Sequence, residues 1–265
     1  MIVHNFDPVL IDFSVFEIRW YSLAYIFGIL SGWFYGKSII KKNILLENKK
    51  LYLDNFDDLV GYIIIGVIVG GRLGYVIFYD PKFYFYNFSE TVKIWNGGMS
   101  FHGGLVGVII AIYLFSNFKN LNYKIYFDTI CCVAPIGLFL GRIANFINSE
   151  LYGVPTEKFW GVIFPKVDNI SRHPSQIYEA FLEGLVLFVI LNFLIAKKSY
   201  RQGFISSIFL ILYGIFRITS EYFREPDQNI GYIFGYLSMG TLLSIIMILF
   251  GILLLSKINF NEKNR

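Results

Sequence analysis

Charged residues are scarce in this chain: Asp, Glu, Lys and Arg make up 16% of its 265 residues, whereas a typical soluble domain contains about 25%. Hydrophobic residues account for 55%, and the mean hydropathy is +0.56. The net charge is only +4, and no basic cluster of the kind that binds nucleic acid occurs along the chain. This composition argues against a soluble protein and predicts an integral membrane protein with no nucleic-acid partner.

Cysteine and histidine are also rare, with two and three residues. Cys131 and Cys132 are adjacent in an apolar run, a placement typical of buried, inert thiols. No Cys/His spacing indicates a metal site, and no cofactor is expected. The first basic side chain is Arg19, so the chain lacks the positive region that opens a cleavable signal peptide. We therefore expect the first apolar segment to remain in the mature protein.

Long apolar segments dominate what is present, and seven of them approach the roughly 20 residues that a helix needs to cross a membrane. They lie near 19–37, 59–79, 102–118, 126–147, 177–196, 204–223 and 235–256. We therefore expect an all-α membrane protein, a polytopic bundle of about seven transmembrane helices that forms a single integral membrane domain over 1–265. The predicted outer loops include 80–101 and 148–176, which would carry a small outer-face head region.

Lys and Arg are divided unequally between the two sets of loops. Thirteen fall in one set, which comprises Lys37, 38–58, 119–125, 197–203 and 257–265. Seven fall in the other, which comprises the N-terminus to Arg19, 80–101, 148–176 and 224–234. Because cytoplasmic loops are enriched in basic residues, we expect the N-terminus outside and the C-terminus in the cytoplasm.

The remaining basic residues lie inside predicted spans: Arg72, Arg142 and Arg217. An Arg at the centre of a membrane helix costs at least about 2.5–3.5 kcal/mol on insertion scales, so it requires a partner or a function. Structural ion pairs are one interpretation, and Glu179 and Glu183 are favoured as counter-charges for Arg142 or Arg72. With the predicted orientation, however, all three arginines lie in the outer halves of their spans, which favours a site that opens to the outer leaflet.

The sixth span carries a polar face formed by Tyr213, Arg217, Glu221 and Arg224, spaced 4, 4 and 3 residues apart. Arg217 and Glu221 are placed to pair, so Glu221 would hold the guanidinium in position. A planar guanidinium matches the oxygens of a phosphate. The alternative is that the two residues only neutralise each other.

The fourth span ends in a polar stripe in which Arg142, Asn145 and Ser149 follow helical spacing, with Asn148 and Glu150 close by. This is more polarity than a core helix needs, although interhelical hydrogen bonding would also account for it. The third span is entered through glycines at 97, 98, 103 and 104, with His102 among them. Glycine permits a loop that folds back toward a cavity, and histidine is suited to moving protons near neutral pH.

Together these residues resemble the prolipoprotein diacylglyceryl transferase family. The strongest match is Gly141-Arg142-x-x-Asn145-Phe146-x-Asn148-x-Glu150-x-x-Gly153. Further matches follow the family's order along nearly the whole chain: Arg19-Trp20-Tyr21, Gly70-Gly71-Arg72-Leu73-Gly74-Tyr75, Gly97-Gly98-Met99-Ser100-Phe101-His102-Gly103-Gly104, His173-Pro174-Ser175-Gln176 and Tyr213-Gly214-x-x-Arg217-x-x-x-Glu221-x-x-Arg224-x-Pro226-Asp227. Ser22 departs from the glycine expected after Trp-Tyr.

The resemblance implies an enzyme at the outer side of the bacterial inner (plasma) membrane. It would move the diacylglyceryl group of phosphatidylglycerol to the lipobox cysteine thiol in the signal peptide of a prolipoprotein, forming a thioether and releasing glycerol phosphate. The expected catalytic residues are His102 as base, Arg142, Arg217 and Tyr21. The expected substrate-binding residues are Arg142, Asn145, Glu150, Gly153, Tyr213, Glu221 and Arg72.

A membrane transporter for an anionic solute or lipid is the alternative, because intramembrane Arg and Glu also mark solute pathways. A transporter typically shows inverted repeats and a site near the midplane. This chain has no internal repeat, and its polar residues lie toward one face of the membrane. The sequence therefore favours the enzyme.

Overall fold

The computed structural model describes residues 2–14, 17–43, 46, 48–197, 201–226, 232–233 and 237–263. The chain forms two compact units. The first comprises Met1–Gly36 and Asp128–Arg265, and the second comprises Lys37–Phe127.

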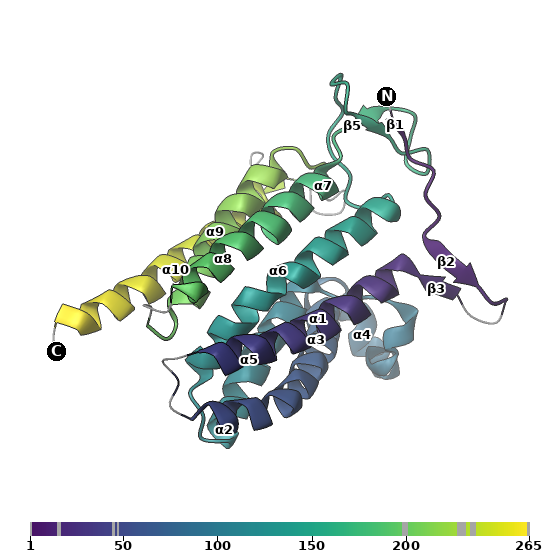
Figure 1. Ribbon diagram of the computed structural model, residues 1–265. Helices are drawn as coiled ribbons and strands as arrows, with labels where there is room; N and C mark the ends of the chain where they lie inside the picture. The colour runs from purple at the N-terminus through teal and green to yellow at the C-terminus, as the bar shows by residue number, and fades with distance from the viewer. Residues whose placement is uncertain are drawn as a thin grey trace. The chain divides into compact units, whose positions relative to one another are not determined.

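Most of the first unit is helical, and its long helices α6, α8, α9 and α10 run side by side (Figure 1). Their bounds are α1 Trp20–Lys42, α6 Tyr123–Ile147, α7 Ser175–Glu179, η3 Ala180–Val186, α8 Leu187–Ala196, α9 Phe204–Glu221 and α10 Met239–Lys263. The segments α7, η3 and α8 form one continuous apolar helix, of which η3 is a π-helical stretch.

Small strands form a head at one end of these helices. The sheet has the order β1 (Ile2–Val3), β4 (Val162–Ile163), β5 (Ser171–Arg172), with β1 parallel to β4 and β4 antiparallel to β5. The N-terminal strand thus completes a sheet whose other strands lie in the predicted head region. Two short antiparallel pairs, β2 (Val9–Asp12) with β3 (Glu17–Arg19) and β6 (Tyr232–Ile233) with β7 (Leu237–Ser238), complete the strands of the described residues.

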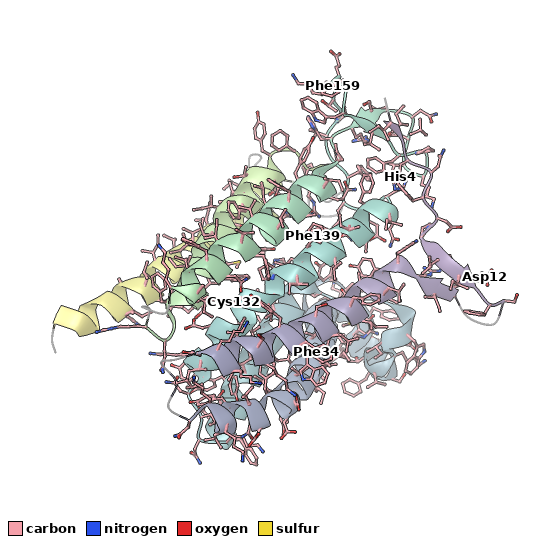
Figure 2. The ribbon with its side chains drawn as sticks, viewed as in Figure 1. His4, Asp12, Phe34, Cys132, Phe139 and Phe159 are labelled. Atoms are coloured by element: carbon pink, nitrogen blue, oxygen red, sulfur yellow. The ribbon has the colours of Figure 1, made fainter. Side chains whose placement is uncertain are left out.

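Contacts between small residues fix α1 against α6. A Cβ on Gly28 would lie 3.2 Å from Gly137 Cα, and one on Gly32 would lie 3.6 Å from Val133. The Tyr35 hydroxyl donates to Asn192 Oδ1 at 2.8 Å, and Asn192 donates to the Cys132 carbonyl at 3.3 Å. Cys132 lies on α6 (Figure 2) and is buried, as predicted. Cys131 is only partly buried.

The start of α9 is tied to α6 by one buried acid. The Asp128 carboxylate accepts hydrogen bonds from the backbone N–H groups of Gly203 at 2.7 Å and Ser206 at 2.8 Å. Backbone N–H groups in the first turn of a helix have no partner within the helix, so a carboxylate stabilises them strongly. This contact fixes the position of α9 along its axis relative to α6. It therefore helps to align Arg217 and Glu221, which lie on α9, with Arg142, which lies on α6.

The second unit contains α2 (Lys49–Asp54), α3 (Phe56–Phe78), α4 (Pro81–Tyr86), two short 3₁₀ turns, η1 (Phe88–Val92) and η2 (Ile94–Asn96), and α5 (Phe101–Phe118). Helices α3 and α5 approach closely along glycines. A Cβ on Gly74 would lie 2.7 Å from Gly103 Cα, and one on Gly70 would lie 2.8 Å from Gly107 Cα. Such small-residue contacts are typical of helix pairs in membranes.

Six described helices are long and apolar enough to cross a membrane: Trp20–Lys42, Phe56–Phe78, Tyr123–Ile147, Ser175–Ala196, Phe204–Glu221 and Met239–Ile258. A shorter apolar helix occupies His102–Phe118. Helices therefore occupy all seven ranges expected from the apolar segments. The predicted fold class, an all-α polytopic membrane protein, is confirmed.

Candidate active site

Two glutamates lie on the helix that contains the π-helical stretch. Glu179 is the last residue of α7 and Glu183 lies within η3, and both are fully buried. Stretches of π-helix are rare and occur frequently at functional sites. A Cβ on Gly184 would lie 2.6 Å from the Phe139 side chain, so this stretch passes close to α6. Two carboxylates without solvent require cationic partners.

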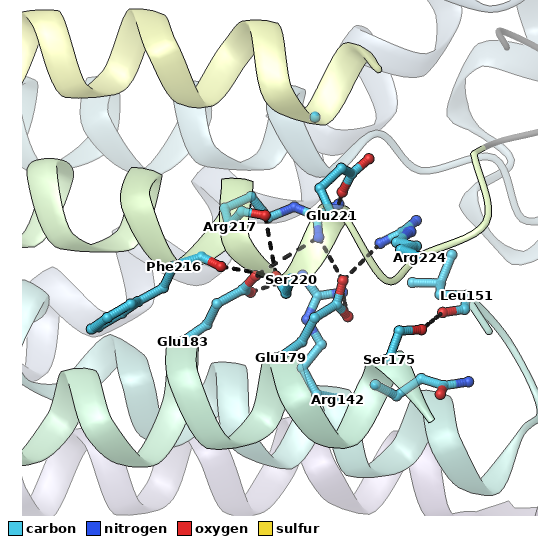
Figure 3. A network of polar contacts seen from close by, with 12 residues as sticks. Arg142, Leu151, Ser175, Glu179, Glu183, Phe216, Arg217, Ser220, Glu221 and Arg224 are labelled. Carbon is cyan, nitrogen blue, oxygen red and sulfur yellow. Dashed lines mark hydrogen bonds and ion pairs between the residues drawn. The ribbon is translucent and has the colours of Figure 1, made fainter. Parts of the chain in front are cut away.

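Arg142 of α6 supplies one of these partners. Its Nη1 lies 3.2 Å from Glu179 Oε2, and its Nη2 lies 3.1 Å from Glu183 Oε2 (Figure 3). One guanidinium thus spans both carboxylates. The prediction that the two glutamates are counter-charges for Arg142 is confirmed.

Arg217 of α9 faces the same pair from another helix. Its Nη1 lies 2.5 Å from Glu179 Oε1 and 3.8 Å from Glu183 Oε1, and its Nη2 lies 2.5 Å from Glu221 Oε2. The pairing of Arg217 with Glu221 is the one that their spacing of four residues predicts.

Arg224 and Ser220 complete the network. Arg224 Nη1 lies 3.2 Å from Glu179 Oε1, and the Ser220 hydroxyl donates to Glu183 Oε1 at 3.1 Å. We refer to Arg142, Arg217, Arg224, Glu179, Glu183 and Glu221 as the ion-pair cluster. Its three positive and three negative charges balance. The side chains of Glu179 and Glu183 are fully buried, whereas those of the arginines retain 7–13% exposure. The Glu221 side chain is 11% exposed, so the accessible part of the cluster holds the three guanidiniums and one carboxylate.

A sharp turn follows α6 and places Glu150 beside the helix end. Ser149 and Leu151 have positive φ angles of 60° and 56°. Asn145 Nδ2 donates to one carboxylate oxygen of Glu150 at 3.1 Å, and Asn148 Nδ2 donates to the other at 3.2 Å. The prediction that Ser149 continues the helical stripe is wrong, because α6 ends at Ile147 and the Ser149 hydroxyl instead contacts His4 Nδ1 at 3.2 Å.

Gly153 joins the head loop to the segment that carries Arg224. The two residues form an antiparallel bridge, and the Gly153 N–H donates to the His173 carbonyl at 3.0 Å. A Cβ on Gly153 would lie 2.5 Å from the Phe223 carbonyl and closer still to that of His173. Because both obstacles are backbone atoms, only glycine fits.

Arg172 is a further buried residue of this region that the sequence reasoning did not single out. It lies 2.7 Å from Asp168 and 3.2 Å from Glu225, and it donates to the Gly153 carbonyl at 3.1 Å. The hydrogen bonds from Arg172 lower the pKa of Asp168. The signal available in the sequence was the position of Arg172 directly before the motif His173-Pro174-Ser175-Gln176.

Tyr21 is placed by the antiparallel contact of α1 with α6. Gly28 lies against Gly137 and Gly32 against Val133, so four residues forward on α1 correspond to four residues back on α6. Moving seven residues from Gly28 back to Tyr21 leads seven residues forward from Gly137, to position 144. Tyr21 is thus level with the turn that contains Arg142 and Asn145. Tyr213 lies on α9, buried and stacked on Phe209 at 5.7 Å between ring centroids.

The sequence model of the prolipoprotein diacylglyceryl transferase family matches residues 8–257. The chain belongs to this family. A phosphatidylglycerol–prolipoprotein diacylglyceryl transferase of Rickettsia bellii (strain OSU 85-389) is 51% identical over 255 residues, which cover 96% of this chain and 95% of the relative. The enzyme of the same name from Rickettsia typhi (strain ATCC VR-144 / Wilmington) is 50% identical over 261 residues, which cover 98% and 99%.

Two residues expected in the site of this transferase family member belong to the second unit. Arg72 is buried on α3, and its hydrogen bonds go to backbone carbonyls of the loop before α5. His102 is exposed in the first turn of α5, whose N-cap residue Ser100 accepts from the Gly103 N–H at 3.2 Å. Gly97 and Gly98 precede this turn with φ angles of 80° and 78°, which favour glycine. Among the described residues, no group of three or more His, Cys, Asp or Glu side chains is arranged to hold a metal ion.

Proposed function

We propose that this multi-pass membrane protein transfers the diacylglyceryl group of phosphatidylglycerol to the lipobox cysteine thiol of a prolipoprotein. Family membership supports the reaction, and the names of the relatives contain both substrates. The protein lies in the bacterial inner membrane, with its N-terminus outside, its C-terminus in the cytoplasm and the ion-pair cluster toward the outer leaflet. The distribution of Lys and Arg supports this orientation.

The reaction balances as a displacement at carbon. The thiol loses its proton, the sulfur attacks the diacylglyceryl carbon that bears the phosphate oxygen, and the carbon–oxygen bond breaks. A thioether forms, and the bonding pair leaves with the oxygen of glycerol phosphate. The phosphate gains charge during this step, so fixed cationic donors in a site with little water stabilise the transition state.

The observation that carries the proposal is the arrangement of the ion-pair cluster, in which two carboxylates lie deeper than the guanidiniums that they bind. Fully buried Glu179 and Glu183 hold Arg142 and Arg217 in place, while both guanidiniums remain partly accessible beside Glu221. An arginine held by a carboxylate is preorganised for the phosphate, and it loses little conformational freedom when the lipid binds.

Each expected residue then has a role. Arg142 and Arg217 bind the phosphate, Glu221 orients Arg217, and Asn145 and Tyr21 bind headgroup or glycerol oxygens. Glu150, Gly153 and Tyr213 shape the site, and His102 takes the thiol proton. Arg72 is proposed to contribute to substrate binding through the loop that it holds.

A transport activity for an anionic solute or lipid is not favoured, because the relatives are named as transferases. The decisive experiment mixes purified protein with phosphatidylglycerol and a lipobox peptide. Release of glycerol phosphate and formation of the thioether support the enzyme, whereas flux into proteoliposomes without that release supports transport.

Arg142 variants test the site itself. Arg142→Ala should abolish transfer, and Arg142→Lys should restore it only in part, because a single ammonium group lacks the planar fork that faces both carboxylates. Arg201→Ala, at an exposed arginine, is the matched control. Wild-type turnover in folded Arg142→Ala protein would refute the assignment.

The orientation has its own test. In intact cells, an impermeant thiol reagent should not label Lys49→Cys, because 38–58 is proposed to face the cytoplasm. Labelling there would reverse the proposed orientation and leave the reaction itself untouched.

A further inference from the structure

The segment between α3 and α5 exposes many large aromatic side chains. We call residues 78–95 the aromatic arm, which contains α4, η1 and part of η2. Five of its aromatic residues are 75–82% exposed: Phe78, Phe85, Tyr86, Phe88 and Trp95. Burying an aromatic side chain is strongly favourable, and a contiguous exposed apolar surface of this kind marks an interaction site.

The arm has a defined fold, because the Arg72 guanidinium forms hydrogen bonds with its backbone. The guanidinium donates to the carbonyl oxygens of Glu90 at 2.6 Å and Thr91 at 2.9 Å, and to those of Gly97 at 2.5 Å and Gly98 at 3.0 Å. Its carbon also lies 5.1 Å from the centre of the Tyr84 ring. The Tyr84 ring thus packs against Arg72. The hydrogen bonds of Arg72 fix the backbone that carries the exposed rings.

The first turn of the arm is also fixed locally. Pro81 opens α4, and the Asp80 side chain accepts from the Phe83 N–H at 3.3 Å. Tyr75 and Tyr79 stack at 5.0 Å between ring centroids across the junction with α3. Phe85, Tyr86 and Phe88 are therefore exposed on a segment whose backbone has a defined conformation.

The chemistry of the arm identifies the surface that it fits. Its exposed apolar surface continues that of membrane-spanning α3, where Leu73 and Ile77 are 46% and 58% exposed. Lys82, Asn87 and Lys93 alternate with the aromatic residues, and short 3₁₀ turns leave backbone groups that hydrocarbon would not satisfy. Tyr and Trp mixed with Lys are enriched where the bilayer meets water.

We propose that the aromatic arm is an interfacial anchor that lies in the lipid headgroup layer, and that Arg72 is the residue that organises it. The same guanidinium holds the carbonyls of Gly97 and Gly98, which lead into α5. The arm therefore sets the depth at which His102 begins that helix. This inference rests on the membrane-spanning helices and not on the proposed reaction.

Fluorescence of Trp95 tests the anchor. The full-length chain with Trp20→Phe, Trp33→Phe and Trp160→Phe retains only Trp95 and is reconstituted in phosphatidylcholine–phosphatidylglycerol vesicles. Lipids brominated near the headgroup should quench Trp95 more than lipids brominated near the chain ends. Aqueous iodide should quench it several-fold less than it quenches N-acetyltryptophanamide, and a matched chain that retains only Trp33, on α1, gives the reference for a transmembrane helix.

Iodide quenching of Trp95 equal to that of the free amide would overturn the proposal. Protection from both iodide and brominated lipid would also overturn it, because another protein surface, such as a second copy of the chain, would then cover the arm. Introducing Arg72→Lys into the Trp95 protein should raise iodide quenching, because an ammonium group cannot reach all four carbonyls. Unchanged quenching would remove Arg72 from the proposal, while the measurement on the Trp95 protein itself does not depend on that variant.

Discussion

Glu179 Oε2 lies 3.2 Å from Nη1 of Arg142, and this contact joins two helices at a point where the carboxylate has no access to solvent. The other oxygen of Glu179 faces Arg217 and Arg224. One acid thus neutralises parts of three guanidiniums that come from separate segments of the chain. Its removal would leave cationic charge buried without compensation.

Glu179→Gln should therefore destabilise the protein strongly. Breaking a buried ion pair by removing one partner typically costs about 3–5 kcal/mol. Thermal unfolding of the purified protein in detergent measures the effect, and Glu157→Gln, at an exposed acid of the head, is the matched control. Equal melting temperatures for the two variants would show that the ion-pair cluster does not hold these helices together.

Gly153→Ala and Gly141→Ala should behave in opposite ways although both glycines belong to the same motif. A Cβ at position 153 would collide with two backbone carbonyls, whereas one at position 141 would meet no atom within 4 Å apart from its chain neighbours and the backbone of its own helix. Gly153→Ala should lower the melting temperature and the transfer rate together, because the bridge to Arg224 must open. Gly141→Ala should be neutral in stability or better, since alanine favours a helix over glycine by about 1 kcal/mol. Tolerance of alanine at 153 would contradict the observed packing.

The sequence predicted the parts of this structure that depend on short-range periodicity. The apolar segments predicted a helical membrane protein, and the described residues contain six helices long and apolar enough to cross a membrane and one shorter apolar helix. A spacing of four residues paired Arg217 with Glu221. The need to neutralise buried charge predicted that Glu179 and Glu183 are counter-charges for Arg142 or Arg72, and Arg142 is the partner that they contact. These inferences need only helix geometry and electrostatics.

The remainder depends on contacts between distant segments. The periodicity of the sequence does not predict the pairing of Ile2 with Val162. It also does not predict the positive φ angle of Ser149, which takes this residue out of the helical stripe. A carboxylate was one partner considered for Arg72, but its guanidinium binds the carbonyls of a loop whose shape no local pattern specifies. The π-helical stretch at Glu183 likewise follows no local pattern, and its Gly184 lies against Phe139 of α6.

The head should lose stability in mild acid because of His4. This residue is 3% exposed and packs against Phe6, Phe146 and Phe164, and burial lowers its pKa below the ordinary value of 6.5. The folded protein thus favours neutral His4, whose stabilising contribution is complete above pH 6.5 and is lost as the pH falls through the lowered pKa.

Melting temperatures measured from neutral pH down to mild acid check this sign. His4→Phe keeps an aromatic ring and should flatten the decrease in acid. Burial also lowers the pKa of His173, so His173→Gln should flatten the decrease independently. A decrease that is unchanged in both variants would assign the acid sensitivity to other groups.

His102 provides the test of mechanism. It is exposed in the first turn of α5, after a glycine loop whose shape the chain fixes through Arg72. If it removes the thiol proton, His102→Gln should lower turnover by about 10²–10⁴-fold while phosphatidylglycerol binding changes little. The residual rate should rise with pH, because a free thiol with a pKa of about 8.5 is increasingly ionised at higher pH.

A purely structural His102 predicts a different set of results. Activity would then fall in step with the melting temperature, and the pH profile would keep its shape. Turnover of His102→Gln, measured from mildly acidic to mildly alkaline pH beside its melting temperature and lipid affinity, separates the two cases. An unchanged rate at neutral pH in a stable variant would remove His102 from the mechanism. The thiol would then have to ionise in the field of Arg142 and Arg217, and conversion of either arginine to a neutral residue should make the residual rate rise more steeply with pH.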